Sequence, residues 1–248
     1  MKEAETLEAE TLETEDMNWM NEYEGVGQDT LDSNVRAVPF LSLNQPSSES
    51  VSEESPEGTW RNSTSGKNFG PMVRVVALAF HTVWAEREEG TGKTLARYSP
   101  NSIEVEVKQP KPGKKGFPKM YSVQTGNEIQ EQYIYAIILP DHPEDGVMYY
   151  CPAPTSMKTC RSWNSMLFSQ LLPNGAQAPI FAYSWNLCAE MVPNPQQPNK
   201  QMAKLTKAVR DVLTSKELFA QSIKPQLSTI NQSTLLIADS VESEASDN

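Results

Sequence analysis

The most distinctive polar feature of the sequence is a lysine-rich segment from residue 108 to residue 119. Its twelve residues include five lysines, three prolines and two glycines, a composition that predicts an exposed loop between strands. Lysines in such a loop can displace counterions from phosphates, and neighbouring aromatic rings can stack on unpaired bases. An alternative is a solvated loop whose lysines only keep a strand edge soluble. The residues in question are Lys108, Lys111, Lys114, Lys115 and Lys119, with Phe117 and Tyr121.

Further basic and aromatic residues are scattered through the central part of the chain. We predict that they extend the same nucleic-acid-binding surface, with cations on phosphates and rings on bases. Lys158 and Arg161 share a polar face of an expected helix, and they would contribute if that face is accessible. Trp60 is expected to stack on bases. The other candidates are Lys67, Arg74, Arg97 and Tyr98.

No set of residues has the spacing of a catalytic or metal site. The two histidines, His81 and His142, have no partner at metal-ligand spacing, and the acidic residues of the central region are scattered. The segment Gly90-Thr91-Gly92-Lys93-Thr94 resembles a phosphate-binding P-loop, but Arg87 stands where that motif needs a glycine. We therefore expect no enzyme activity, no metal and no cofactor, and a metal-dependent nuclease ranks third among the functions considered.

The charge of the chain is divided among three regions. Residues 1–57 contain 15 acidic and 2 basic residues, residues 58–224 contain 13 and 19, and residues 225–248 contain 4 and none. The sums, −13, +6 and −4, add to the net charge of −11. A basic centre suits nucleic acid, and an acidic tail suits inhibition in cis or recruitment of partners, although it could simply be solubilising. The tail acids are Asp239, Glu242, Glu244 and Asp247.

The hydrophobic pattern predicts a mainly β domain with one internal helix. Apolar or alternating runs predict strands, and the residues from Met157 to Leu171 have helical spacing. Strands that are apolar on both faces are typical of a small closed barrel. We therefore predict an α+β fold with an OB-like β-barrel and appended helices. The strands are expected at residues 73–84, 98–107, 120–123, 133–139, 147–151 and 180–187.

Composition and periodicity divide the chain into four parts. Residues 1–57 read as an acidic, mostly disordered arm with a possible docking peptide at 38–43, and residues 58–192 as the barrel domain. Residues 193–230 are expected to form an appended helical segment, and residues 231–248 a disordered acidic tail. Within the helical segment, the predicted elements are a helix at 202–212 and a second one from Lys216 to Ile223, stopped by Pro225.

Two stretches of the sequence resemble a group of bacteriophage proteins. The first joins Pro39-Phe40-Leu41 to Glu57-Gly58-Thr59-Trp60, Asn62-Ser63-Thr64-Ser65-Gly66-Lys67 and the strand that starts at Val73. The second comprises Pro154-Thr155-Ser156-Met157-Lys158, Trp163-Asn164, Leu167 and Pro179-Ile180-Phe181-Ala182-Tyr183. The resemblance covers about residues 38–192, and the group consists of phage single-stranded DNA-binding proteins with an OB-like barrel.

This resemblance implies a protein that protects single-stranded DNA in phage replication or recombination, in the cytoplasm of a bacterial host. Its partners would be single-stranded DNA and, through the acidic tail, replication or recombination proteins. No membrane partner is expected, and a homo-oligomer is left open. Many members carry cysteine pairs between the early strands, which this chain lacks, so a zinc-supported loop is not expected. The alternative from another class is a virion or assembly protein whose acidic arms bind other subunits.

Overall fold

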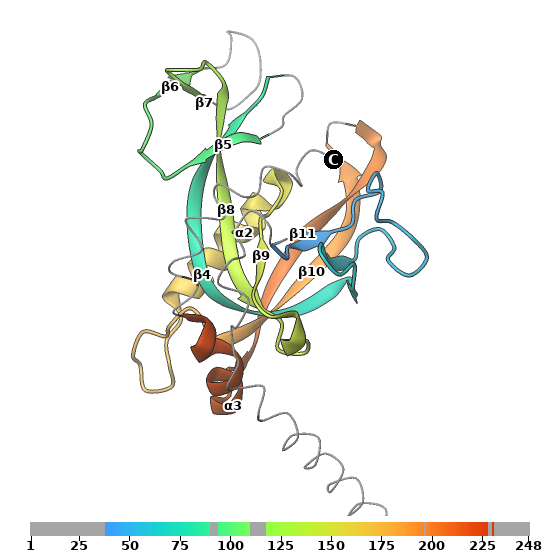
Figure 1. The fold of residues 1–248 in the computed structure, drawn as a ribbon, viewed down its shortest axis with the longest axis vertical. Coiled ribbons are helices and arrows are strands. Elements are labelled where there is room, and N and C mark those ends of the chain that lie inside the picture. Colours follow the sequence, from blue (N-terminus) through green and yellow to red (C-terminus); the bar gives the residue numbers. More distant parts are fainter. Residues whose placement is uncertain (1–37, 90–93, 110–117, 196, 228–229, 231–248) are drawn as a thin grey trace, which may run out of the picture. The chain divides into compact units, whose positions relative to one another are not determined.

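A computed structural model describes the chain at residues 38–89, 94–109, 118–195, 197–227 and 230. All described residues belong to one compact unit, residues 37–248. This unit is mainly β with a helical segment near its end, as the sequence predicts (Figure 1). No described helix has both the length and the apolar character needed to cross a membrane.

The main sheet contains eight antiparallel strands. Their order is β11-β10-β4-β8-β7-β6, with β5 added to β4 and β9 added to β8. Since β6 and β11 stand at opposite ends of this order, the pairings among described residues do not close the sheet. The mainly β class is confirmed, and the OB-like barrel stays a prediction. The strands are β4 (Met72–Arg87), β5 (Thr94–Tyr98), β6 (Val105–Lys108), β7 (Lys119–Ser122), β8 (Glu128–Ile138), β9 (Met148–Tyr150), β10 (Tyr183–Asn194) and β11 (Gln197–Leu213).

The long strand β4 holds the main sheet together. Its first part, residues 72–76, pairs with β10, and its last part, residues 84–87, pairs with β5. Residues 76–87 pair with β8 along the other edge, with a register shift between Ala77 and Ala79. Such a bulge bends a strand, and Figure 1 shows β4 curving from the β10 end of the sheet to the β5 end.

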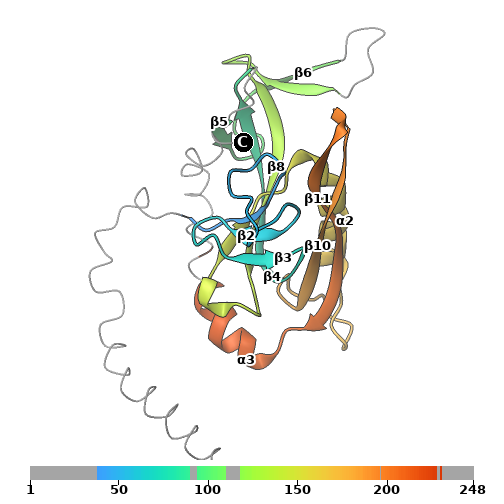
Figure 2. The ribbon, with the colours of Figure 1, turned by 90° about the vertical axis from the view of Figure 1, so that its right-hand side faces the viewer.

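A second sheet contains three short antiparallel strands, β1 (Leu41–Leu43), β2 (Trp60–Asn62) and β3 (Asn68–Gly70) (Figure 2). Just before β1, Phe40 forms a parallel bridge with Tyr149 of β9. Residues 38–57, which the sequence assigned to a mostly disordered arm, therefore follow a defined path. The buried amide of Asn44 fixes that path, because it donates to the hydroxyl oxygens of Ser55 and Thr59. Composition alone does not reveal hydrogen bonds between residues so far apart.

Both faces of the main sheet are buried in its centre, which explains the apolar runs at residues 75–80 of β4 and residues 133–138 of β8. On one face, helix α2 (Met157–Ser169) and β2 cover the sheet; on the other, the C-terminal helical segment and the Val38–Phe40 peptide do so. The predicted buried face of α2 is confirmed at Cys160, Trp163 and Leu167. Leu171 falls beyond the helix and is exposed.

The prediction of a helix at residues 202–212 is wrong, since β11 spans Gln197–Leu213. The spacing of Met202, Leu205, Val209 and Val212 matches a helix, but Ala203 and Leu205 are the residues that are buried. Pairing with β10 along the whole of β11 overrides the local pattern. A register shift where β11 pairs with Cys188 and Ala189 of β10 also disturbs the alternation of buried and exposed residues in β11. The helical spacing of apolar residues at 202–212 therefore does not reflect a helix, because it occurs in a strand that contains a bulge.

Two further boundaries differ from the sequence expectations. The expected strand at 98–107 is interrupted by a turn between β5 and β6, where Asn101 has φ 66°. The C-terminal helical segment comprises α3 (Lys216–Leu218) and a π-helical turn (Phe219–Ile223), and it continues past Pro225 to Leu227. A π turn changes the hydrogen-bond spacing of a helix, so Pro225 does not stop it.

Candidate nucleic-acid interface

The lysine-rich segment connects the two strands of a hairpin at one end of the main sheet. In this β6–β7 hairpin, Lys108 lies opposite Lys119, and Glu106 lies opposite Tyr121. The predicted contact residues Lys111, Lys114, Lys115 and Phe117 lie between the strands in sequence but outside the described residues. The structure therefore places two of the five lysines and Tyr121 together.

The two described lysines make contacts at the solvent-exposed surface. Lys108 Nζ lies 4.6 Å from the ring centroid of Tyr121 and 2.5 Å from a carboxylate oxygen of Glu106. Lys119 Nζ lies 2.5 Å from a carboxylate oxygen of Glu128. The lysine side chains are 54% and 56% exposed, so both ammonium groups are accessible to a ligand.

The charge state of the hairpin is favourable to anions. A hydrogen bond to Glu128 raises the pKa of Lys119 above its ordinary value, so this side chain stays cationic. Burial acts to raise the pKa of Glu128, but hydrogen bonds from Lys119 and Gln130 outweigh it and lower that pKa. Exposed ion pairs of this kind contribute little to stability, and phosphates can replace their carboxylates at small cost.

A buried carboxylate holds the base of the hairpin. Glu86 of β4 is 3% exposed and accepts hydrogen bonds from the hydroxyls of Tyr98 and Thr125 and from the amide of Asn127. Burial acts to raise the pKa of Glu86, yet these hydrogen bonds lower it overall. The same contact raises the pKa of Tyr98 to about 12. Tyr98 was predicted to stack on bases, and the structure instead gives its hydroxyl a structural hydrogen bond.

Trp60 was also predicted to stack, and the structure contradicts this. Its side chain is completely buried, and its Nε1 donates to the backbone oxygen of Leu187 at 3.2 Å. The ring packs edge-on against Tyr150 with centroids 5.4 Å apart. Trp60 belongs to the core because β2 lies directly over the main sheet, a placement that the sequence pattern did not show.

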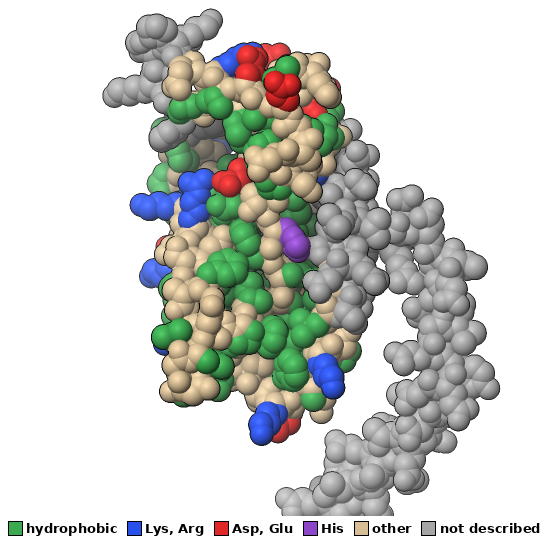
Figure 3. Space-filling view, turned by 90° about the vertical axis from the view of Figure 1, so that its left-hand side faces the viewer, with side chains coloured by type: hydrophobic (Ala, Val, Ile, Leu, Met, Phe, Trp, Pro, Cys, Tyr) green, Lys and Arg blue, Asp and Glu red, His purple; other side chains and the backbone are tan. Residues whose placement is uncertain are grey.

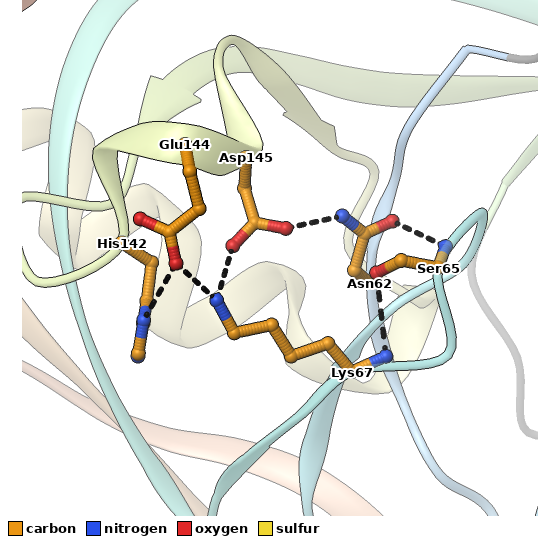
Figure 4. Close-up of polar contacts among 6 residues, drawn as sticks. All are labelled: Asn62, Ser65, Lys67, His142, Glu144 and Asp145. Atoms are coloured by element: carbon orange, nitrogen blue, oxygen red, sulfur yellow. Dashed lines mark hydrogen bonds and ion pairs between the residues drawn. The ribbon is translucent and has the colours of Figure 1, made fainter. Parts of the chain in front are cut away.

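Lys67 lies in a group of polar side chains that we call the clasp (Figure 4). The clasp consists of Asn62, Lys67, His142, Glu144 and Asp145. Lys67 Nζ lies 2.5 Å from Glu144 and 2.9 Å from Asp145, whose side chain is only 7% exposed. The amide of Asn62 donates to Asp145 at 2.9 Å. The hydrogen bond to Glu144 is the main cause that raises the pKa of Lys67, and it also lowers the pKa of Glu144. The clasp therefore fastens the β2–β3 turn to the 3-10 helix η3 (Pro143–Asp145).

The clasp also brings together three potential metal ligands that the sequence analysis judged unpromising. Ligand atoms of His142, Glu144 and Asp145 lie within 4.8 Å of one another. The Lys67 ammonium group contacts both carboxylates, and so it supplies the positive charge that a cation would bring. A structural role explains all of these contacts, and we assign no metal to the group.

The remaining predicted cations lie elsewhere. Arg74 is paired with Asp141 and, at 3.7 Å, with Asp211. Arg161 of α2 contacts Glu131 at 3.2 Å. Arg97 is 9% exposed and lines a pocket that is open to solvent. These arginines are thus not gathered with the hairpin lysines.

Lys158 is exposed at the start of α2 and lines a shallow groove between this helix and β11. Lys207 of β11 lines the same groove, with Met166 and Val209. The sequence analysis missed Lys207 because it placed residues 202–212 on a helix. Figure 3 shows the face on the left-hand side of Figure 1. On this face, hydrophobic side chains cover the centre, and Lys and Arg lie near the margins. The visible described part of that face therefore carries no continuous basic stripe.

A family model described as Pam3 phage gp34-like protein matches residues 7–232, which is most of the chain. No curated protein and no solved structure matches significantly.

Proposed function

We propose a function for this chain from the premise that it belongs to the Pam3 phage gp34-like protein family and is a bacteriophage protein. The chain binds single-stranded DNA during phage replication or recombination, in the cytoplasm of the host. The β6–β7 hairpin is the primary contact, and the acidic C-terminal tail regulates occupancy or recruits partners. Catalysis has no part in this proposal.

One observation carries the proposal, namely the arrangement of lysines on the hairpin. Lys108 and Lys119 face each other across the strand pair, and the connecting sequence contains three more lysines. Five positive charges within twelve residues would neutralise several phosphates, and counterion release would make the affinity strongly dependent on salt. The carboxylate partners of the two described lysines are on or beside the hairpin, so exchange for phosphate needs no change in the fold.

Tyr121 favours a single strand over a duplex. Its ring lies under the Lys108 ammonium group on the hairpin, and half-buried rings of this kind offer a π face to an unpaired base. In a duplex the bases are stacked on one another and present only their edges. An OB-like barrel remains part of the proposal, although binding by the hairpin does not depend on closure of the sheet.

The test is fluorescence anisotropy of a labelled single strand of about thirty nucleotides, titrated at several salt concentrations. Intrinsic tryptophan fluorescence is a weaker probe, because Trp60, Trp163 and Trp185 are buried and Trp84 is half-buried. Changing all five hairpin lysines to glutamate should lower the affinity more than about a hundredfold. A charge-matched control changes five lysines elsewhere to glutamate, namely Lys2, Lys200, Lys204, Lys216 and Lys224.

The two variants have the same net charge, so they separate a local site from a general electrostatic effect. Equal loss of affinity in both variants would contradict a site on the hairpin. A flat titration of the unmodified chain at low salt, repeated after removal of residues 231–248, would contradict single-strand binding altogether.

A second function, self-assembly, is favoured by the free edge of β11. At Ala203, the backbone N–H and C=O bond to the side chain of Gln45, and the N–H of Leu205 donates to Ser156. Beyond these residues, β11 pairs only with β10 among the described strands. Val209, Val212 and Leu213 are about half exposed there, which is unusual for a strand at the edge of a sheet.

The partner in this second proposal is another copy of the chain. Antiparallel pairing centred on Val209 would place Lys207 opposite the partner's Asp211, and symmetry would repeat this ion pair on the other side. Sedimentation analysis should show a dimer that Val209→Pro converts to a monomer. A monomer at all concentrations would overturn it, and Val107→Pro in the exposed hairpin strand is the control.

A further inference from the structure

The groove between α2 and β11 has a volume of about 310 Å³ and is open along one side of the helix. Its lining includes two lysines, three hydroxyl side chains and no carboxylate. It lies at a different place from the hairpin, because β6 and β11 stand at opposite ends of the strand order. The residues that line it are Lys158, Thr159, Ser162 and Met166 of α2, and Thr206, Lys207, Ala208 and Val209 of β11.

The two groove lysines carry charge that the described part of the chain does not neutralise. Neither Lys158 nor Lys207 forms an ion pair there, in contrast to the lysines of the hairpin and the clasp. Both are exposed, and the residue paired with Lys207 on β10 is Cys188. An exposed ammonium group without a carboxylate partner needs no exchange of contacts before it binds an anion.

The acids of the two neighbouring strands lie beside other residues. Strand β10 carries one acid, Glu190, which lies opposite Lys204 and not opposite a groove residue. Strand β11 also carries one, Asp211, which lies 3.7 Å from Arg74 and accepts a hydrogen bond from the Ser184 hydroxyl at 3.4 Å. The positive character of the groove is therefore not offset by these two carboxylates.

Beyond the groove, β11 carries a third cation that is held in a defined position. Arg210 follows Ala208 by two residues and so shares its face of the strand. The guanidinium carbon lies 5.0 Å from the ring centroid of Tyr183, and the Tyr183 hydroxyl donates to the backbone oxygen of Leu171 at 3.1 Å. The ring thus fixes Arg210, which is exposed, near the end of α2.

This arrangement suits a linear polyanion with planar groups. Lys158 is in the first turn of α2 and Leu171 lies just beyond its last, so the cations accompany a helix of 13 residues, about 20 Å long. Lysines bind successive phosphates of a strand, and arginine planes and aromatic rings stack on unpaired bases. An acidic peptide would use the lysines, but it has no base to stack on the arginine.

We infer that the α2–β11 groove is a second binding site for single-stranded DNA. Lys158 and Lys207 contact phosphates, and Arg210, supported by Tyr183, stacks on a base at the end of the groove. The inference rests on the proposed function, because it assigns a further part of the same strand to this surface. A dimer paired along β11 would cover Lys207 and Val209, so the dimer and the strand should exclude each other at this edge.

The first test is fluorescence anisotropy with Lys158→Ala combined with Lys207→Ala. The affinity for the labelled single strand should fall by about tenfold, and the slope of log affinity against log salt should fall by about 1.4. The matched control combines Lys200→Ala with Lys216→Ala, which removes two exposed lysines outside the groove and gives the same net charge. Equal effects in the two variants overturn the inference.

A second test places a reporter in the groove. Val209 lines the groove and is 48% exposed, so Val209→Trp adds an accessible ring whose emission is the difference from the unmodified chain. Quenching by an unlabelled single strand, lost when Lys158 and Lys207 are also changed to alanine, supports the inference. Binding by anisotropy without quenching of this ring overturns it. So does a change of its emission on removal of residues 231–248 that DNA does not reproduce, because the groove then belongs to the acidic tail.

Failure of the proposed function and failure of this inference give different results. If the unmodified chain binds no single strand at low salt, with and without residues 231–248, both fail. If it binds, and the groove variant matches its control while the hairpin variant with five glutamates loses affinity, only the inference fails. Loss of affinity in the groove variant combined with full affinity in the hairpin variant supports the inference and moves the primary contact from the hairpin to the groove.

Discussion

The hairpin and the clasp both contain lysines in contact with carboxylates, yet they differ in what surrounds the contact. In the hairpin, Lys108 and Lys119 are more than half exposed, and each has one carboxylate partner. In the clasp, Lys67 is held by two carboxylates, one of them on the nearly buried Asp145. Positive charge is therefore available to a ligand in the first region and committed to the fold in the second.

This contrast separates binding from stability. Carboxylates that are buried and accept several hydrogen bonds should matter for folding, whereas exposed ones should matter little. For DNA affinity we expect the opposite order. The exposed lysines of the hairpin should matter most, and Lys67, which is held in the clasp, should matter little. Both halves of this comparison can be measured on single substitutions.

The largest effect on stability is expected at Glu86, at the base of the hairpin. Glu86→Ala removes the buried acceptor of three hydrogen bonds, and its half-buried or exposed donors lose that partner. The free energy of unfolding should fall by about 3 kcal/mol in urea denaturation. Glu106→Ala, an exposed carboxylate of the same hairpin, should change it by less than about 0.5 kcal/mol. Similar losses in both variants would show that burial is not the deciding factor.

The next effect is expected at the clasp. Asp145→Ala leaves the Asn62 amide and one side of Lys67 without their acceptor, and should cost about 1–3 kcal/mol of unfolding free energy. The affinity for single-stranded DNA should stay within about twofold, since no hairpin residue changes. Glu144→Ala is the matched control, because this carboxylate binds the same lysine from an exposed position. A larger loss of stability at Glu144 than at Asp145 would reverse our interpretation of the clasp.

At the hairpin, Lys108→Ala combined with Lys119→Ala should weaken DNA binding by about tenfold at moderate salt. Two fewer phosphate contacts should reduce the slope of log affinity against log salt by about 1.4 for a single strand. The unfolding free energy should be nearly unchanged, because the lost ion pairs are exposed. An unchanged salt slope would remove these two lysines from the interface, whatever the change in affinity.

The smallest effect is a dependence of stability on pH. The folded-state pKa of Glu86 lies below its ordinary value of 4.5, so the folded state binds this proton less readily than the unfolded state. The stabilisation is therefore complete above pH 4.5 and is lost as the pH falls through the lower folded-state pKa. Urea denaturation between pH 6 and about pH 3 should show a shallower decline for Glu86→Gln than for the unmodified chain. Parallel curves would mean that Glu86 does not contribute to acid denaturation.

The sequence predicted those parts of the fold that local patterns determine. The apolar run of β4, the buried face of α2 at Cys160, Trp163 and Leu167, and the hairpin around the lysine segment follow from periodicity and turn composition. The helix assigned to residues 202–212 failed because β11 depends on pairing with β10, and its bulge imitates helical spacing. Long-range pairing of this kind leaves no local signal.

The candidate site also combines features that local patterns reveal with features that depend on long-range contacts. Lysine spacing was enough to locate the hairpin, but no sequence pattern could show that Trp60 is buried, that Lys67 is enclosed by η3, or that Arg97 and Arg87 line one pocket. Each of these depends on segments separated by many residues. The lone signal for Glu86 was an acidic residue at the end of an apolar strand, which alone does not distinguish an exposed carboxylate from a buried acceptor.

The way β4 is shared among its neighbours has a consequence for synthesis of the protein. Its partners are β5, β8 and β10, and the last of these becomes available only after residue 183 has been translated. Until then, residues 72–76 of the nascent chain have an unpaired edge that is rich in valine. A ribosome that stalls before β10 would release a fragment with this edge exposed, and such fragments should aggregate more readily than ones ending after residue 213.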